Sequence, residues 1–86
     1  MLIIRLKVEY KKERGIIIKK LSPREMQVLR EIIKGSTNLA ISKQLYVSLA
    51  TVKAHVSSIF RKLETTNRVR AAVLGVEILR NLEQQQ

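Results

Sequence analysis

Residues 38–63, which read NLAISKQLYVSLATVKAHVSSIFRKL, decide the predicted fold because two helical segments meet here across a very short turn. In the first segment, residues 38–45, the apolar positions are Leu39, Ile41 and Leu45. Residues 46–48 make a tight turn, and Ser48 is a favoured N-cap for the second segment, which runs to about residue 63. The helical period of this second segment predicts a buried arc of Val52, Val56, Ile59, Phe60 and Leu63.

The opposite side of the second segment is polar and contains no acidic residue. Lys53, Ser57 and Arg61 recur every four residues, so they share one face of the helix. Ala54 and Ser57 are small, so they let the helix approach the base edges of DNA. Lys53 can donate to guanine acceptors or to phosphate. Arg61 and Lys62 can reach the backbone. Two helices joined in this way are typical of a helix-turn-helix, although an ordinary helical bundle can also expose a polar stripe.

Upstream, another helix is predicted to start at residue 23. Ser22 is a good N-cap, Pro23 occupies the first helical position and Glu25 completes a capping box. Gly35 is expected to end this helix. The apolar residues of one face are Met26, Leu29, Ile32 and Ile33.

Downstream, a last helix is predicted from about Asn67 to about residue 82, and its apolar residues are too many for a single core face. Two stripes result. We expect the first stripe to face the core, and the second to form a dimer seam or to cover residues 1–20. Gly75 either allows close approach of a partner helix or is simply tolerated. The first stripe contains Val69, Ala72, Val73 and Val76, and the second contains Leu74, Ile78 and Leu82.

Residues 1–20 have a different period. Apolar residues alternate with mostly charged ones from Leu2 to Tyr10, residues 11–15 suit a turn, and Ile16–Ile18 suits a return strand. We therefore predict a mainly α protein with two parts: an N-terminal extension over residues 1–20 that forms a β-hairpin, and a four-helix helix-turn-helix domain over residues 21–86.

Composition excludes several classes of function. The chain has 86 residues and no cysteine, so disulfides and thiolate metal sites are ruled out. His55 is the single histidine and there is no carboxylate cluster, so we expect no metal, no cofactor and no enzymatic activity. No apolar run is long enough to span a membrane, and no membrane association is expected. A cytoplasmic location fits the absence of cysteine.

The formal net charge is +10, which favours a polyanionic partner such as nucleic acid. Between Ile32 and Leu63 there are five basic residues and no acidic one. A long stretch of one sign indicates a surface that faces an anion, although a solvated basic face is the simpler alternative.

The chain resembles the LuxR/FixJ (GerE-like) C-terminal domain over about residues 21–82. The resemblance implies that the third helix of residues 21–86 reads DNA and that the fourth forms a homodimer. The matching positions are Leu21-Ser22-Pro23-Arg24-Glu25, Val28-Leu29, Gly35, Asn38, Ile41, Leu45, Val47-Ser48, Thr51-Val52-Lys53, His55-Val56, Ile59, Lys62-Leu63, Asn67-Arg68 and Ala71-Ala72.

Carried over by position, the resemblance implies two groups of site residues, and the second apolar stripe of the last helix, with Gly75, predicts a third. The expected base contacts are Lys53, Ala54 and Ser57; the expected phosphate contacts are Lys43, Thr51, Arg61 and Lys62, with the backbone amides near Thr37 and Asn38; the expected dimer contacts are Leu74, Gly75, Ile78 and Leu82.

Three positions depart from the family pattern. Ala40 replaces the glutamate that would complete a capping box with Thr37, and Leu39 and Leu49 are apolar where the family is usually polar. The short helix is therefore expected to be less well capped.

The function that follows is a sequence-specific regulator of transcription that binds double-stranded DNA and lacks a sensor domain. The alternative is a protein-interaction module that contacts a sigma factor or another regulator. RNA polymerase is a further candidate partner. A start at Met1 and a polar C-terminal tail favour a stand-alone regulator over a fragment. The operator, the regulated genes and the signal do not follow from the sequence.

Overall fold

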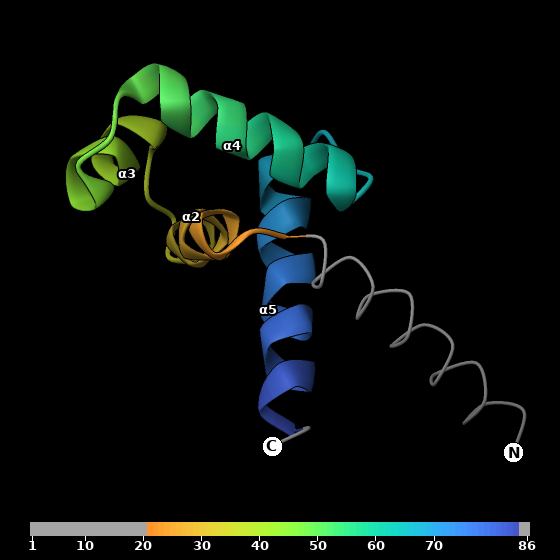
Figure 1. Ribbon diagram of the computed structural model, residues 1–86. Helices are drawn as coiled ribbons and strands as arrows, with labels where there is room; N and C mark the ends of the chain where they lie inside the picture. The colour runs from red at the N-terminus through yellow and green to blue at the C-terminus, as the bar shows by residue number, and fades with distance from the viewer. Residues whose placement is uncertain (1–20, 85–86) are drawn as a thin grey trace, which may run out of the picture.

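A computed structural model describes residues 21–84, and all the regular structure in this range is helical. The helices are α2 (Pro23–Ile33), α3 (Asn38–Leu45), α4 (Leu49–Lys62) and α5 (Arg68–Gln84) (Figure 1). The predicted four-helix, mainly α fold is confirmed. The predicted hairpin of residues 1–20 lies outside the described residues.

Local capping interactions define both ends of helix α2. The Ser22 hydroxyl accepts from the Glu25 amide at 3.0 Å, and the Glu25 carboxylate accepts from the Ser22 amide at 2.8 Å, so the predicted capping box is present. At the other end Gly35 has φ of +88°, a left-handed conformation that favours glycine. Its amide and the next donate back to the carbonyls of Ile32 and Glu31, which ends the helix in a Schellman motif.

The next two helices are also capped by hydroxyls. Thr37 Oγ1 accepts from the Ala40 amide at 3.1 Å, but Ala40 has no polar side chain to complete the reciprocal half of a capping box. Ser48 Oγ accepts from the Thr51 amide at 3.0 Å, as predicted for the N-cap of α4. Between them Tyr46 adopts a left-handed conformation with φ of 57°, which turns the chain sharply from α3 into α4.

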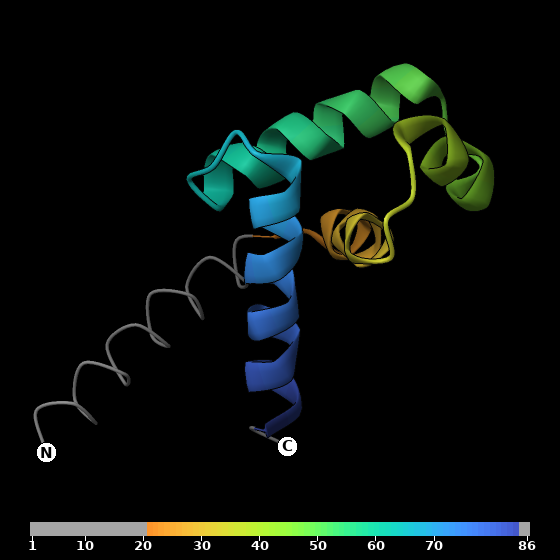
Figure 2. The same cartoon turned by 180° about the vertical axis from the view of Figure 1, so that it is seen from behind.

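Helix α2 lies at the centre of the described chain and packs against both α4 and α5, whereas α3 packs mainly against α4 (Figures 1 and 2). Most of the predicted core is confirmed, but Leu39 is 53% exposed and Phe60 is only partly buried. The buried apolar residues are Leu21, Val28, Leu29, Ile32, Ile41, Val52, Val56, Ile59, Leu63, Ala71 and Ile78.

The burial of the two apolar stripes of α5 differs from that predicted. Ile78 is 1% exposed and belongs to the core, so the interpretation that it faces away from the core is wrong. A Cβ added at Gly75 would lie 2.9 Å from Ile33 Cδ1, so this glycine lets α5 approach α2 of the same chain. Val69 and Val73, expected in the core, are 74% and 58% exposed. The core contacts of α2 therefore determine the orientation of α5.

The second stripe has two further members, Leu74 and Leu82. Leu74 is partly buried and packs against the core cluster. Leu82 is half-buried, near the end of the helix that leads away from α2. Neither residue lies on the exposed apolar face of α5.

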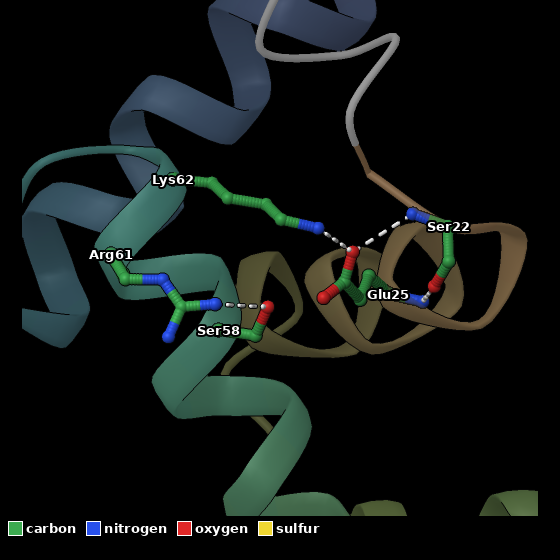
Figure 3. A network of polar contacts seen from close by, with 5 residues as sticks. All are labelled: Ser22, Glu25, Ser58, Arg61 and Lys62. Atoms are coloured by element: carbon green, nitrogen blue, oxygen red, sulfur yellow. Dashed lines mark hydrogen bonds and ion pairs between the residues drawn. The ribbon is translucent and has the colours of Figure 1, made fainter.

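A partly buried ion pair joins the start of α2 to the end of α4 (Figure 3). The Lys62 ammonium lies 2.8 Å from Glu25 Oε1, the oxygen that also accepts from the Ser22 amide. Burial by itself would raise the pKa of Glu25. The hydrogen bonds from Lys62, Ser58 and the Ser22 amide, with the Lys62 charge, outweigh this effect and lower the pKa to about 2. Glu25 is therefore a helix cap and an interhelical contact at once.

This ion pair predicts a defined acid sensitivity. Because folding lowers the pKa of Glu25 from 4.5 to about 2, its stabilising contribution is complete above pH 4.5 and is lost as the pH falls toward 2. One pKa unit corresponds to about 1.4 kcal/mol, so this part of the free energy of unfolding is on the order of 3–4 kcal/mol. Denaturant unfolding at several pH values measures it.

Glu25→Gln should lower stability at pH 7 and remove most of the loss between pH 4.5 and 2. Glu64→Gln, at an exposed position, is the control and should leave the pH dependence nearly unchanged. Equal pH profiles for the wild-type protein and Glu25→Gln would contradict the assigned role.

Candidate nucleic-acid interface

The outer face of α4 is exposed. Figures 1 and 2 show α4 along one edge of the molecule, with α3 at its N-terminal end and α5 leading away from its C-terminal end. Lys53, Ala54 and Ser57, the predicted base contacts, are all exposed. Because they lie opposite the buried Val52 and Val56, the packing of α4 on α2 keeps them pointing outward.

The chemistry of this face suits a narrow, anionic partner surface. Ala54 and Ser57 add little bulk, so the helix backbone can approach closely, while Lys53 supplies a flexible cationic donor. The first turns of α3 and α4 contain no acidic residue, so the positive ends of both helix dipoles stay uncompensated there. Shape and charge together favour duplex DNA over a neutral partner.

Three of the predicted phosphate contacts, Thr37, Lys43 and Thr51, are exposed around α3 and the start of α4. Lys43 is in the last turn of α3, and Thr37 is its N-cap. At the start of α4, Thr51 Oγ1 lies 2.8 Å from Ser48 Oγ. The cap therefore fixes the Thr51 hydroxyl at the N-terminal end of the helix that carries Lys53.

Lys62 and Arg61, neighbours in sequence, occupy different environments. The Lys62 side chain is 24% exposed and its ammonium binds Glu25, so Lys62 takes part in the contact between α4 and α2. Arg61 is exposed, and its guanidinium lies 3.5 Å from Ser58 Oγ, one turn back along α4 (Figure 3). Of these two predicted phosphate contacts, Arg61 alone has the open position that the role needs.

The Asn38 side chain points toward the protein. Its Oδ1 accepts from the guanidinium of Arg68 at 2.7 Å, and Arg68 also donates to the Ser36 carbonyl at 2.8 Å. A phosphate contact at Asn38 would therefore use its backbone amide. Sequence reasoning did not assign a role to Arg68, and its only signal was a place in the quoted Asn67-Arg68 pair.

Residues 21–84 meet neither the requirements of a metal site nor those of a membrane span. No group of three or more histidine, cysteine, aspartate or glutamate residues in this range could hold a metal ion. None of the described helices is long and apolar enough to cross a membrane.

Comparison with known proteins identifies the architecture. The family model of the bacterial regulatory proteins of the luxR family (GerE) matches residues 19–74. The chain is 47% identical over 57 residues to a nitrate/nitrite response regulator protein homolog of Haemophilus influenzae, a match that covers 66% of this chain and 27% of that protein.

Two further relatives are similar to this chain. A putative HTH-type transcriptional regulator of Escherichia coli, YhjB, is 40% identical over 66% of this chain and 28% of its own length. The response regulator protein VraR of Staphylococcus saprophyticus is 39% identical over 77% of this chain and 32% of its own length. The matched part thus spans about a quarter to a third of each of these relatives.

The interface predicts separable roles for two cations of α4. Lys53→Ala should cost on the order of 1–3 kcal/mol of binding free energy to a selected duplex and relax specificity at one base position. Arg61→Ala should weaken selected and random duplexes about equally and flatten the salt dependence. Titrations against both duplexes at several salt concentrations measure these effects.

Gln44→Ala, an exposed change on α3 that removes no charge, is the control. If Lys53→Ala and Arg61→Ala lost affinity in the same ratio for the two duplexes, the division into base and phosphate contacts would be wrong.

Proposed function

The chain belongs to the luxR family of bacterial regulatory proteins, and we propose that it is a sequence-specific transcription regulator that binds double-stranded DNA as a homodimer. Membership places it among DNA-binding regulators of transcription and not among enzymes. The proposal adds three statements to family membership. The chain binds specific DNA sequences, it forms a homodimer, and it binds DNA without a sensor domain.

The observation that supports specificity is the outward face of α4. The major groove is about 12 Å wide and admits an α-helix, and each base pair presents a distinct pattern of donors and acceptors there. Lys53, Ala54 and Ser57 are exposed on one side of α4, while Val52 and Val56 hold its other side against the core. We assign these three exposed residues to the base edges.

Phosphate contacts would fix the register of α4 in the groove. The backbone amides at Thr37 and Asn38 lie at the positive end of α3, and Lys43, Thr51 and Arg61 are exposed around the same edge. Lys62 is left out of this set because its ammonium binds Glu25.

The homodimer would form through the apolar residues that α5 leaves exposed. Val69, Val73 and Val76 recur at helical spacing on the side of α5 opposite the buried Ala71 and Ile78. Two such stripes packed together would remove them from water. A two-fold dimer would then read two half-sites about one helical turn of DNA apart. RNA polymerase is the further partner that we propose for a DNA-bound regulator.

Independence from a sensor domain is the third part of the proposal. The helix-turn-helix domain over residues 21–84 has an apolar core of its own, to which all four helices contribute. We therefore expect the 86-residue chain to bind DNA without a phosphorylated or ligand-bound partner domain.

The test is direct binding of the purified chain to a duplex selected from a random pool. The binding constant should fall steeply as the salt concentration rises. In a plot of log K against log[salt], each phosphate neutralised contributes about −0.9 to the slope. With Lys43 and Arg61 bound to phosphates, the slope should be roughly −2 per subunit. Binding that stays constant as salt rises to physiological concentration would refute the proposal.

The dimer has its own prediction. Val73→Glu should give a monomer in sedimentation experiments while its thermal unfolding stays close to that of the wild-type monomer, because Val73 lies outside the core. Ile78→Glu, at a buried position of the same helix, should instead unfold the domain, since an unpaired buried charge is strongly destabilising. A wild-type protein that is monomeric both free and on DNA would exclude the dimer.

A further inference from the structure

Arg68 ties the start of α5 to the start of α3 across 30 residues of sequence. Its guanidinium donates to Asn38 Oδ1 at 2.7 Å and to the Ser36 carbonyl at 2.8 Å. The two acceptors flank Thr37, the N-cap of α3. Arg68 therefore holds the short connection between α2 and α3 from outside both helices.

This contact matters because α3 is otherwise fixed mainly by its packing on α4. Helix α3 has eight residues, of which only Ile41 and Ser42 are buried. A short helix with one principal packing partner can pivot about that partner. The two bonds from Arg68 provide a second, polar attachment at the end of α3 that lies away from its turn into α4.

Local helix electrostatics do not explain why an arginine stands at this position. Arg68 is the first residue of α5, where the helix dipole disfavours a cation, and the first turn contains no acidic residue. Hydrogen bonds from a charged donor are stronger than neutral ones and offset that cost. The tertiary contact to residues 36–38 is thus the reason that the position suits arginine.

The end of α3 that Arg68 holds is the end proposed to bind phosphate. Thr37 Oγ1 accepts from the Ala40 amide, whereas the Asn38 and Leu39 amides precede the first hydrogen-bonded turn and are directed along the helix axis. Binding of Asn38 Oδ1 to Arg68 keeps that side chain toward the protein. The direction of these amides relative to α4 then depends on Arg68.

We propose that Arg68 is a positioning residue for DNA binding, which holds Ser36 and Asn38 so that the N-terminus of α3 meets a phosphate while α4 lies in the major groove. This inference rests on the proposed function. It also makes α5 a support for the DNA contact of α3, in addition to any role in the dimer.

The experiment compares Arg68→Gln with Arg70→Gln in the full chain, on a duplex selected by the wild-type protein from a random pool. Both variants remove one positive charge from the first turn of α5, but Arg70 is exposed. Arg68→Gln should weaken binding about tenfold and Arg70→Gln by less than about threefold. Phosphate ethylation interference should show Arg68→Gln losing the contact made by α3 while the contacts of α4 remain.

A double-mutant cycle with Asn38→Ala tests whether Arg68 acts on DNA binding through Asn38. In the Asn38→Ala background, Arg68→Gln should cost clearly less than its tenfold effect in the wild-type chain, because one of the two acceptors through which it acts has gone. Asn38→Ala removes one acceptor and leaves Arg68 in place, so it serves as the second variant if Arg68→Gln does not fold. Circular dichroism and thermal melts identify folded variants.

The outcomes are distinct. A wild-type chain that does not bind the duplex refutes the proposed function, and this inference with it. Equal losses for Arg68→Gln and Arg70→Gln, additive effects with Asn38→Ala, or uniform weakening of every phosphate contact would overturn the positioning role alone.

Discussion

The packing of α2 on two other helices is the constraint on which the rest of the described structure depends. Val28, Leu29 and Ile32 of this one helix are buried, and α2 contacts both α4 and α5. The contact with α4 fixes which side of the recognition helix faces outward, and the contact with α5 fixes which valines stay exposed. A single short helix thus sets the orientation of both proposed interfaces.

The Glu25–Lys62 ion pair adds specificity to this apolar packing. A buried ion pair contributes little net stability when it is compared with well-packed apolar residues, but the loss of one partner leaves a buried charge and is costly. In this protein the same carboxylate also caps α2, so helix initiation and the docking of α4 share one group. Departure from this single geometry would break both interactions together.

The same geometry separates the cations that bind groups within the protein from those that are exposed on its surface. Lys62 and Arg68 carry charges that are used within the protein, where they bind Glu25 and the start of α3. Lys53 and Arg61 are exposed on α4, where an anion can reach them. A high positive charge is therefore a poor guide to how many residues contact a phosphate, because charge counts do not distinguish structural from surface cations.

The sequence by itself determined the helices, their caps and the outer face of α4. Ser22, Thr37 and Ser48 act on amides three residues away, and the helical period places Lys53 and Ser57 on one face, so these features depend on neighbours within about one turn. Only the tertiary structure decided that Ile78 faces α2 while Val73 does not, because both stripes of α5 are apolar and the choice depends on the close approach at Gly75. The pairing of Lys62 with Glu25 joins residues 37 apart, and no local pattern encodes which distant partner a charged side chain will meet.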